Sequence, residues 1–129
     1  MKRSPKIWTI GHSNRAITEF IDLLKTANIQ VVIDARNKPQ SRFYWFNGAK
    51  LAEYLAEADI AYEHQPSIVR GDNYAEILDS IATRAQNGEH LALMCSEGKP
   101  EQCHRGTELT PELQKRDIEV EHLLYKRVP

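Results

Sequence analysis

Apolar residues follow two alternating patterns along the chain: short continuous runs, and stripes in which every third or fourth residue is apolar. The predicted strands occupy 7–11, 31–36, 60–64, 90–95 and 118–125. The first is β-branched and ends at glycine, and 31–36 is a continuous apolar run, as in a strand that is covered on both faces of a parallel sheet. The stripes predict helices over 17–28, after Asn47 and over 73–85, and a last helix with candidate starts at Pro100 and Thr110. This order predicts an α/β fold: one domain over 1–129, with a mostly parallel five-stranded sheet and helices on both faces.

The expected helix ends depend on a few polar residues. Thr18 is a candidate N-cap for the first helix and Asn47 for the second, because their side-chain oxygens can accept from free N–H groups. Asn28 and the pair Asn87-Gly88 suit the left-handed position that follows a helix.

A parallel sheet brings every strand-to-helix loop to the same edge, where ligands usually bind. Reactive side chains are concentrated in these predicted loops, whereas the opposite turns carry ordinary turn residues. The first loop carries His12 to Arg15, and the others carry Asp34, Arg36, Ser41, Arg42, His64, Arg70, Asp72, Cys95, Glu97, Cys103, His104 and Arg105. The sequence therefore predicts one site at the carboxyl edge of the sheet.

Composition narrows the function classes. The 129 residues carry a formal net charge of −1, so no general basic field exists and extended duplex nucleic acid is not an expected partner. No apolar run is long enough for a membrane span or a signal peptide, so we expect a cytoplasmic protein and no membrane partner. In that compartment the two cysteines, Cys95 and Cys103, are expected to be thiols. No cofactor is predicted.

Three motifs resemble those of a protein family, the domain of unknown function 488 (DUF488). They read TIGHSNR at 9–15, DARNKPQSRF at 34–43 and CSEGKPEQCHR at 95–105. The resemblance extends from about residue 8 to residue 123 and implies a compact α/β domain. It implies no reaction, because the family has no general assigned activity, so the chemistry must come from the residues.

The candidate catalytic residues are Cys95, Glu97 and His12. A thiol between a strand end and a helix start can be held as thiolate, which is a nucleophile. Glu97 and His12 can move protons. In the structural alternative, Cys95 is a small buried residue at a strand end, and His12 binds loop backbone.

The candidate ligand-binding residues either can bind anions or lie in the same predicted loops. They are Ser13, Asn14, Arg15, Arg36, Arg42, His104 and Arg105. Guanidinium groups bind phosphate and carboxylate in bidentate fashion. The alternative for any one arginine is a solvated charge or a pair with Asp34 or Glu97. Four aromatic residues follow at 43–46, and at least one is expected to be exposed, either to stack on a ligand or to make an anchoring or dimer contact.

Other cysteine and histidine chemistry is less well supported. A phosphatase loop needs arginine six residues after the cysteine, where this chain has Glu101, and seven residues separate Cys95 from Cys103, so no Cys-x-x-Cys motif exists. No metal ligand is assigned, although Cys95, Cys103 and His104 keep a metal or redox sensor open. Among the remaining histidines, His64 can join the site, His90 lies at the opposite edge, and His122 is expected to be structural.

The leading hypothesis is a small enzyme that acts on an anionic, phosphorylated or nucleotide-like substrate. The alternatives are a non-catalytic module that binds nucleotides or single-stranded nucleic acid, and a thiol-based metal or redox sensor. The sequence assigns no oligomeric state.

Overall fold

The computed structural model describes residues 5–12, 15–36, 41, 43–65, 74–95 and 110–124, with backbone alone at Tyr74 and Cys95. Strands and helices alternate along the chain as expected. The strands are β1 (Lys6–Gly11), β2 (Val31–Asp34), β3 (Ala61–His64), β4 (Leu91–Cys95) and β5 (Glu119–His122). The helices are α1 (Ile17–Thr26), the short 3-10 helix η1 (Tyr44–Phe46), α2 (Gly48–Glu57), α3 (Tyr74–Gln86) and α4 (Thr110–Gln114).

All strand pairs in the sheet are parallel, and the strand order is β3-β2-β4-β1-β5. The predicted five-stranded α/β architecture is therefore confirmed. In this order β4 lies between β2 and β1, although it follows both of them in the chain. Its residue Met94 pairs with Asp34 on one side and with Ile10 on the other, and Cys95 pairs with Gly11.

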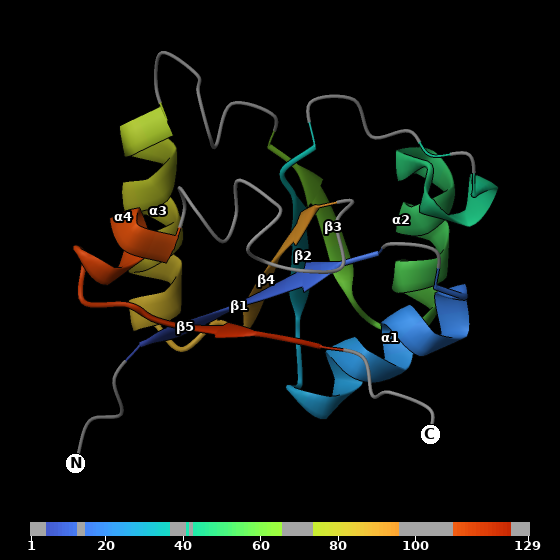
Figure 1. The fold of residues 1–129 in the computed structure, drawn as a ribbon, viewed down its shortest axis with the longest axis horizontal. Helices are drawn as coiled ribbons and strands as arrows, with labels where there is room; N and C mark the ends of the chain where they lie inside the picture. The colour runs from blue at the N-terminus through green and yellow to red at the C-terminus, as the bar shows by residue number, and fades with distance from the viewer. Residues whose placement is uncertain are drawn as a thin grey trace.

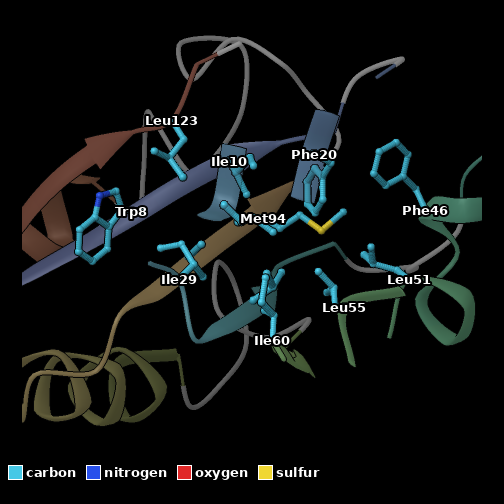
Figure 2. Packing of buried hydrophobic residues seen from close by; sticks show 13 residues of the cluster. Trp8, Ile10, Phe20, Ile29, Phe46, Leu51, Leu55, Ile60, Met94 and Leu123 are labelled. Carbon is cyan, nitrogen blue, oxygen red and sulfur yellow. The ribbon is translucent and has the colours of Figure 1, made fainter. Parts of the chain in front are cut away.

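Two apolar layers form because alternate side chains of each strand face opposite sides of the sheet. The layer between the sheet and α3 and α4 contains Ile7, Val31, Ile33, Leu91, Leu93, Leu78, Ile81 and Leu113. The layer between the sheet and α1 and α2 contains Trp8, Ile10, Val32, Met94, Phe20, Leu24, Phe46, Leu51 and Leu55. Figure 1 shows the two helix pairs on opposite sides of the sheet, and Figure 2 shows the second layer, with Trp8 and Phe46 at its two ends.

The turns that lead from helices to strands use left-handed backbone, as the sequence predicts at two of them. Asn28 has φ 55° and Gly88 has φ 91°, and Asp59 and Asp117 adopt the same region with φ 62° and φ 60°. Aspartate, asparagine and glycine tolerate this conformation better than other residues. These turns all lie at the amino edge of the sheet, opposite the predicted site.

Two predicted N-caps differ from the structure. α1 begins at Ile17 with Ala16 in the cap position, so Thr18 is inside the helix, and Glu19 Oε1 accepts from the Ala16 N–H at 3.3 Å. Asn47 does occupy the N-cap position of α2, but its Oδ1 accepts from the Ser41 N–H at 2.7 Å. The Asn47 side chain thus fixes the preceding loop, because a loop N–H competes with the helix for the same acceptor.

The helices are short relative to a bilayer. No helix in the described part of the chain has the length and apolarity required to cross a membrane.

Candidate functional site

At the carboxyl ends of the neighbouring strands β1 and β4, the chain leaves toward opposite faces of the sheet. The connections from β1 and β2 run through α1 and α2 on one face, whereas the connection from β4 includes α4 on the other face. In open α/β sheets, ligands bind where neighbouring strands send their chains to opposite faces. Here the backbones of Gly11 and Cys95 pair at that point, and His12 follows directly.

His12 is held by an aromatic ring at the end of β1. The residue is 5% exposed, and its imidazole stacks on the ring of Phe46 with centroids 4.4 Å apart and planes inclined by 22°. The Phe46 ring also meets Phe20 edge-on at 5.2 Å, within the apolar layer below α1 and α2. The His12 carbonyl accepts from the Arg15 N–H at 3.1 Å, which closes a turn leading into α1. His12 therefore has a fixed position at the switch point.

Asp34 and Arg36 form a buried ion pair at the end of β2. Arg36 Nη2 lies 2.7 Å from Asp34 Oδ2, with side-chain exposures of 6% and 0%. Arg36 Nε and its backbone N–H donate to Asp34 Oδ1 at 2.9 and 3.1 Å, and Nη2 also donates to the Phe46 carbonyl at 2.8 Å. The pairing with Asp34 is one of the two alternatives that the sequence leaves for this arginine. Phe46 therefore touches both Arg36 and His12.

Two side chains of β3 extend the Asp34 network. The Tyr62 hydroxyl donates to Asp34 Oδ2 at 2.6 Å. His64 lies opposite Asp34 in the sheet, and its Nε2 is 2.6 Å from the Arg36 carbonyl. Because a carbonyl oxygen only accepts, His64 Nε2 carries a proton. His64 thus joins the neighbourhood of the predicted site, as the sequence suggests, by supporting the Arg36 backbone.

Burial, and then the hydrogen bond to Asp34, raise the pKa of Tyr62 above the ordinary tyrosine value. The folded protein therefore holds this proton more tightly than the unfolded chain. It follows that Tyr62 contributes stability that is present below about pH 10, where a free tyrosine titrates, and is lost as the pH rises further.

We expect the Tyr62→Phe protein to lose less stability than the wild type between neutral and strongly alkaline pH. The measurement is the free energy of unfolding from urea titrations across this range, compared between the two proteins. Parallel curves for the two proteins would contradict this assignment.

The aromatic segment after Arg42 covers the start of α1. Trp45 Nε1 donates to the Arg15 carbonyl at 3.0 Å, and Phe46 is fully buried, whereas Tyr44 is 58% exposed. The expectation of an exposed aromatic residue is met by Tyr44. The Arg15 guanidinium lies at the surface, where Nη1 is 3.4 Å from Glu19 Oε2. Such an exposed ion pair contributes little to stability.

The structure brings part of the predicted site together. His12, Arg15 and Arg36 lie at the carboxyl edge with the backbone of Cys95. The other predicted site residues lie outside the described residues. They are Ser13, Asn14, Arg42, Glu97, His104 and Arg105, and Cys103 also lies outside. The remaining histidines differ in place: His90 Nδ1 contacts the Ala27 carbonyl at the amino edge, and His122 pairs with Thr9 across β5 and β1.

Sequence reasoning does not identify Phe46 and Tyr62 as parts of this site. Phe46 is one of four consecutive aromatic residues, and nothing in the run indicates which ring meets His12. Tyr62 is two residues before His64, so strand alternation puts both on one face, but only the pairing of β3 with β2 brings that face to Asp34.

The fold and this group of residues define a small parallel α/β protein with polar side chains gathered at a switch point of the sheet. A family model described as "Domain of unknown function DUF488" matches residues 16–73, and the chain resembles that family over this part. The match includes DARNKPQSRF, whereas TIGHSNR precedes it and CSEGKPEQCHR follows it, so it is narrower than the resemblance expected from the motifs. No curated protein and no solved structure matches the chain.

Proposed function

We propose that the chain is a small enzyme acting on an anionic substrate, with Cys95 as the nucleophile and His12 as its acid/base partner. The observation that carries the proposal is the pairing of Gly11 with Cys95 at the switch point, which brings the start of the His12 loop beside the end of β4.

The arginines have different roles in this proposal. Asp34 already balances the charge of Arg36, and a second buried anion at that point would be costly. Arg36 therefore positions the loop that ends in Phe46, and the anionic group is bound by less buried guanidinium groups. Arg15 is one, and the sequence adds Arg42 and Arg105, with Ser13, Asn14 and His104 as further ligand contacts.

The proposed reaction has two steps, which form and then hydrolyse one covalent intermediate on the Cys95 sulfur. The Cys95 thiolate forms a bond to an electrophilic atom of the substrate as the bond to the leaving group breaks, and His12 supplies a proton to that group. Water then gives a proton to Glu97, and its oxygen forms a bond to the same substrate atom as the bond from that atom to sulfur breaks, which restores the thiolate. The proton on Glu97 is released to solvent, and His12 takes one up again.

Thiol alkylation tests the first step without a known substrate. In a Cys103→Ala protein, iodoacetamide should modify Cys95 at neutral pH about tenfold faster than in the same protein carrying His12→Asn, because the imidazole no longer favours thiolate. Inorganic phosphate or adenosine monophosphate should slow the reaction of the parent protein. Rates are measured by intact mass.

The matched control is His90→Asn, which changes a histidine at the amino edge and should leave the Cys95 rate unaltered. Equal rates in the two histidine variants, with no protection by either anion, would overturn the proposal.

The exposed Tyr44 favours a second candidate, a module that binds nucleotides or single-stranded nucleic acid without chemistry. It predicts an affinity that falls with salt and that survives Cys95→Ala, whereas Tyr44→Ala weakens it. The sensor alternative rests on Cys95, Cys103 and His104, and the last two lie outside the described residues. Elsewhere in the chain, the residues that the structure describes contain no group of three His, Cys, Asp or Glu arranged for a metal ion.

A further inference from the structure

We propose a second ligand site at the amino edge of the sheet, which binds a small organic ammonium compound that also carries a hydrogen-bond acceptor. A pocket of about 550 Å³ lies there between the amino ends of β1 and β5 and the turn after α3. This volume is within the range of small-molecule sites. The residues that decide its chemistry are Lys6, Trp8, Glu89, His90 and Glu119. The site is independent of the proposed function, because it lies at the other end of the strands.

Trp8 gives the pocket an unusual wall. It is 8% exposed and packs in the apolar layer on the side of α1 and α2. Its ring also meets the His90 ring, with centroids 4.8 Å apart, and the Lys6 Nζ, which lies 5.3 Å from its centroid. No described residue accepts a hydrogen bond from its indole N–H. The indole nitrogen is not among the buried polar atoms that lack a partner, so it is accessible and can donate to a ligand that offers an acceptor oxygen.

His90 offers the opposite chemistry. Its Nδ1 is 2.9 Å from the Ala27 carbonyl, and a carbonyl can only accept, so Nδ1 carries the proton. In the neutral ring Nε2 is then an acceptor. The backbone N–H of His90 donates to Gln30 Oε1 at 2.9 Å, which fixes the residue in place. A ligand that donates hydrogen bonds can therefore be held by His90.

The charges around the pocket favour a cation. Lys6 is already bound to Glu121 at 2.7 Å, and Glu89 shares Arg84 with Glu63. In the part of the chain that the structure describes, no residue forms a salt bridge or hydrogen bond with the Glu119 carboxylate. Among the described residues of the lining, two carboxylates, Glu89 and Glu119, face one cation, Lys6, whose charge is shared between Glu121 and Glu119. A ligand ammonium group would balance the negative charge that remains on these described residues.

A metal ion fits these residues less well than an organic cation. No three His, Cys, Asp or Glu side chains within the described ranges are arranged to hold one, and this includes Glu89, His90 and Glu119. The apolar surface of Pro5 and Ala85 in the same pocket suits the carbon skeleton of an organic ligand instead.

Leucinamide is a suitable probe, because it has an ammonium group, a carbonyl oxygen and an apolar side chain. The chain has two tryptophans, so Trp45→Phe leaves Trp8 as the sole indole reporter. We expect leucinamide to change Trp8 fluorescence saturably with a Kd on the order of 1 mM, as for a fragment of this size. N-acetylleucinamide lacks the charge and should bind at least several-fold more weakly.

Glu119→Gln should weaken leucinamide binding by about tenfold, which is the factor for one lost charge-assisted contact. Glu53→Gln on α2 is the matched control and should bind as the parent does, as should Cys95→Ala. Amide chemical shifts of the wild-type protein, followed at His90 and Glu119, give a second readout that does not depend on Trp45→Phe. The absence of saturable binding in both readouts, or equal affinities of Glu119→Gln and Glu53→Gln, would overturn the proposal.

Discussion

Asp34→Asn is expected to lower the free energy of unfolding by about 3–5 kcal/mol, because it leaves the buried Arg36 guanidinium without a counter-charge. Asp34 is fully buried and accepts from Arg36 and from the Tyr62 hydroxyl, so the change weakens several hydrogen bonds at once. Asparagine has nearly the same shape, which separates the loss of charge from a loss of packing. Urea denaturation at neutral pH measures the difference.

The matched control for this pair is Glu63→Gln. Glu63 binds Arg84 at 2.9 Å, but these side chains are 35% and 25% exposed, so water screens their attraction. The control should cost no more than about 1 kcal/mol. If the two variants were equally stable, the Asp34 and Arg36 charges would have to be solvated and not buried as the structure shows them.

Phe46→Ala is expected to have an effect of similar size, about 3–5 kcal/mol, because it removes a fully buried ring and leaves a cavity in the layer below α1 and α2. The same ring supports His12 and packs against Phe20, as Figure 2 shows for the two phenylalanines. We therefore also expect slower alkylation of Cys95 in the fraction that remains folded. Denaturation and alkylation of the same preparation separate the two effects.

Tyr44→Ala is the control for Phe46→Ala, since it removes an adjacent aromatic ring that is 58% exposed. Its cost should stay within about 0.5 kcal/mol, as for most surface substitutions. A large loss of stability in Tyr44→Ala, or a small loss in Phe46→Ala, would mean that the two rings have exchanged places.

The parts of the candidate site that could be predicted from the sequence are those that depend on interactions between residues close together in the chain. That His12, Arg15, Arg36 and Cys95 share one edge could be predicted, because strand-to-helix loops of a parallel sheet always emerge on the same side. The pairing of Arg36 with Asp34, two residues away, stood as an alternative on sequence grounds, but its full burial did not follow from the sequence. That burial requires β3 and the segment up to Phe46 to close over it.

The helix caps also could not be predicted from the local sequence alone. Thr18 and Asn47 have the right side chains for capping, yet Ala16 takes the first position and the Asn47 oxygen accepts from Ser41. A cap contributes about 1 kcal/mol, so tertiary contacts that move a loop by one or two residues can readily outweigh it.

The strands, the helices and the parallel α/β class of this protein follow from local patterns in the sequence. Continuous apolar runs such as 31–36 and 90–95 must be covered on both faces, and the helices between them have one apolar side each. These are properties of neighbouring residues, and they suffice for a parallel sheet between helix layers.

The strand order, and with it the set of residues that meet at the site, became known from the three-dimensional fold. The insertion of β4 between β2 and β1 makes Cys95 the neighbour of Gly11 and Met94 the neighbour of Asp34. Any strand order would bury similar apolar runs, so the pattern along the chain does not distinguish among them. The order depends on how whole helices and strands pack together, and those contacts join residues that are far apart in the sequence.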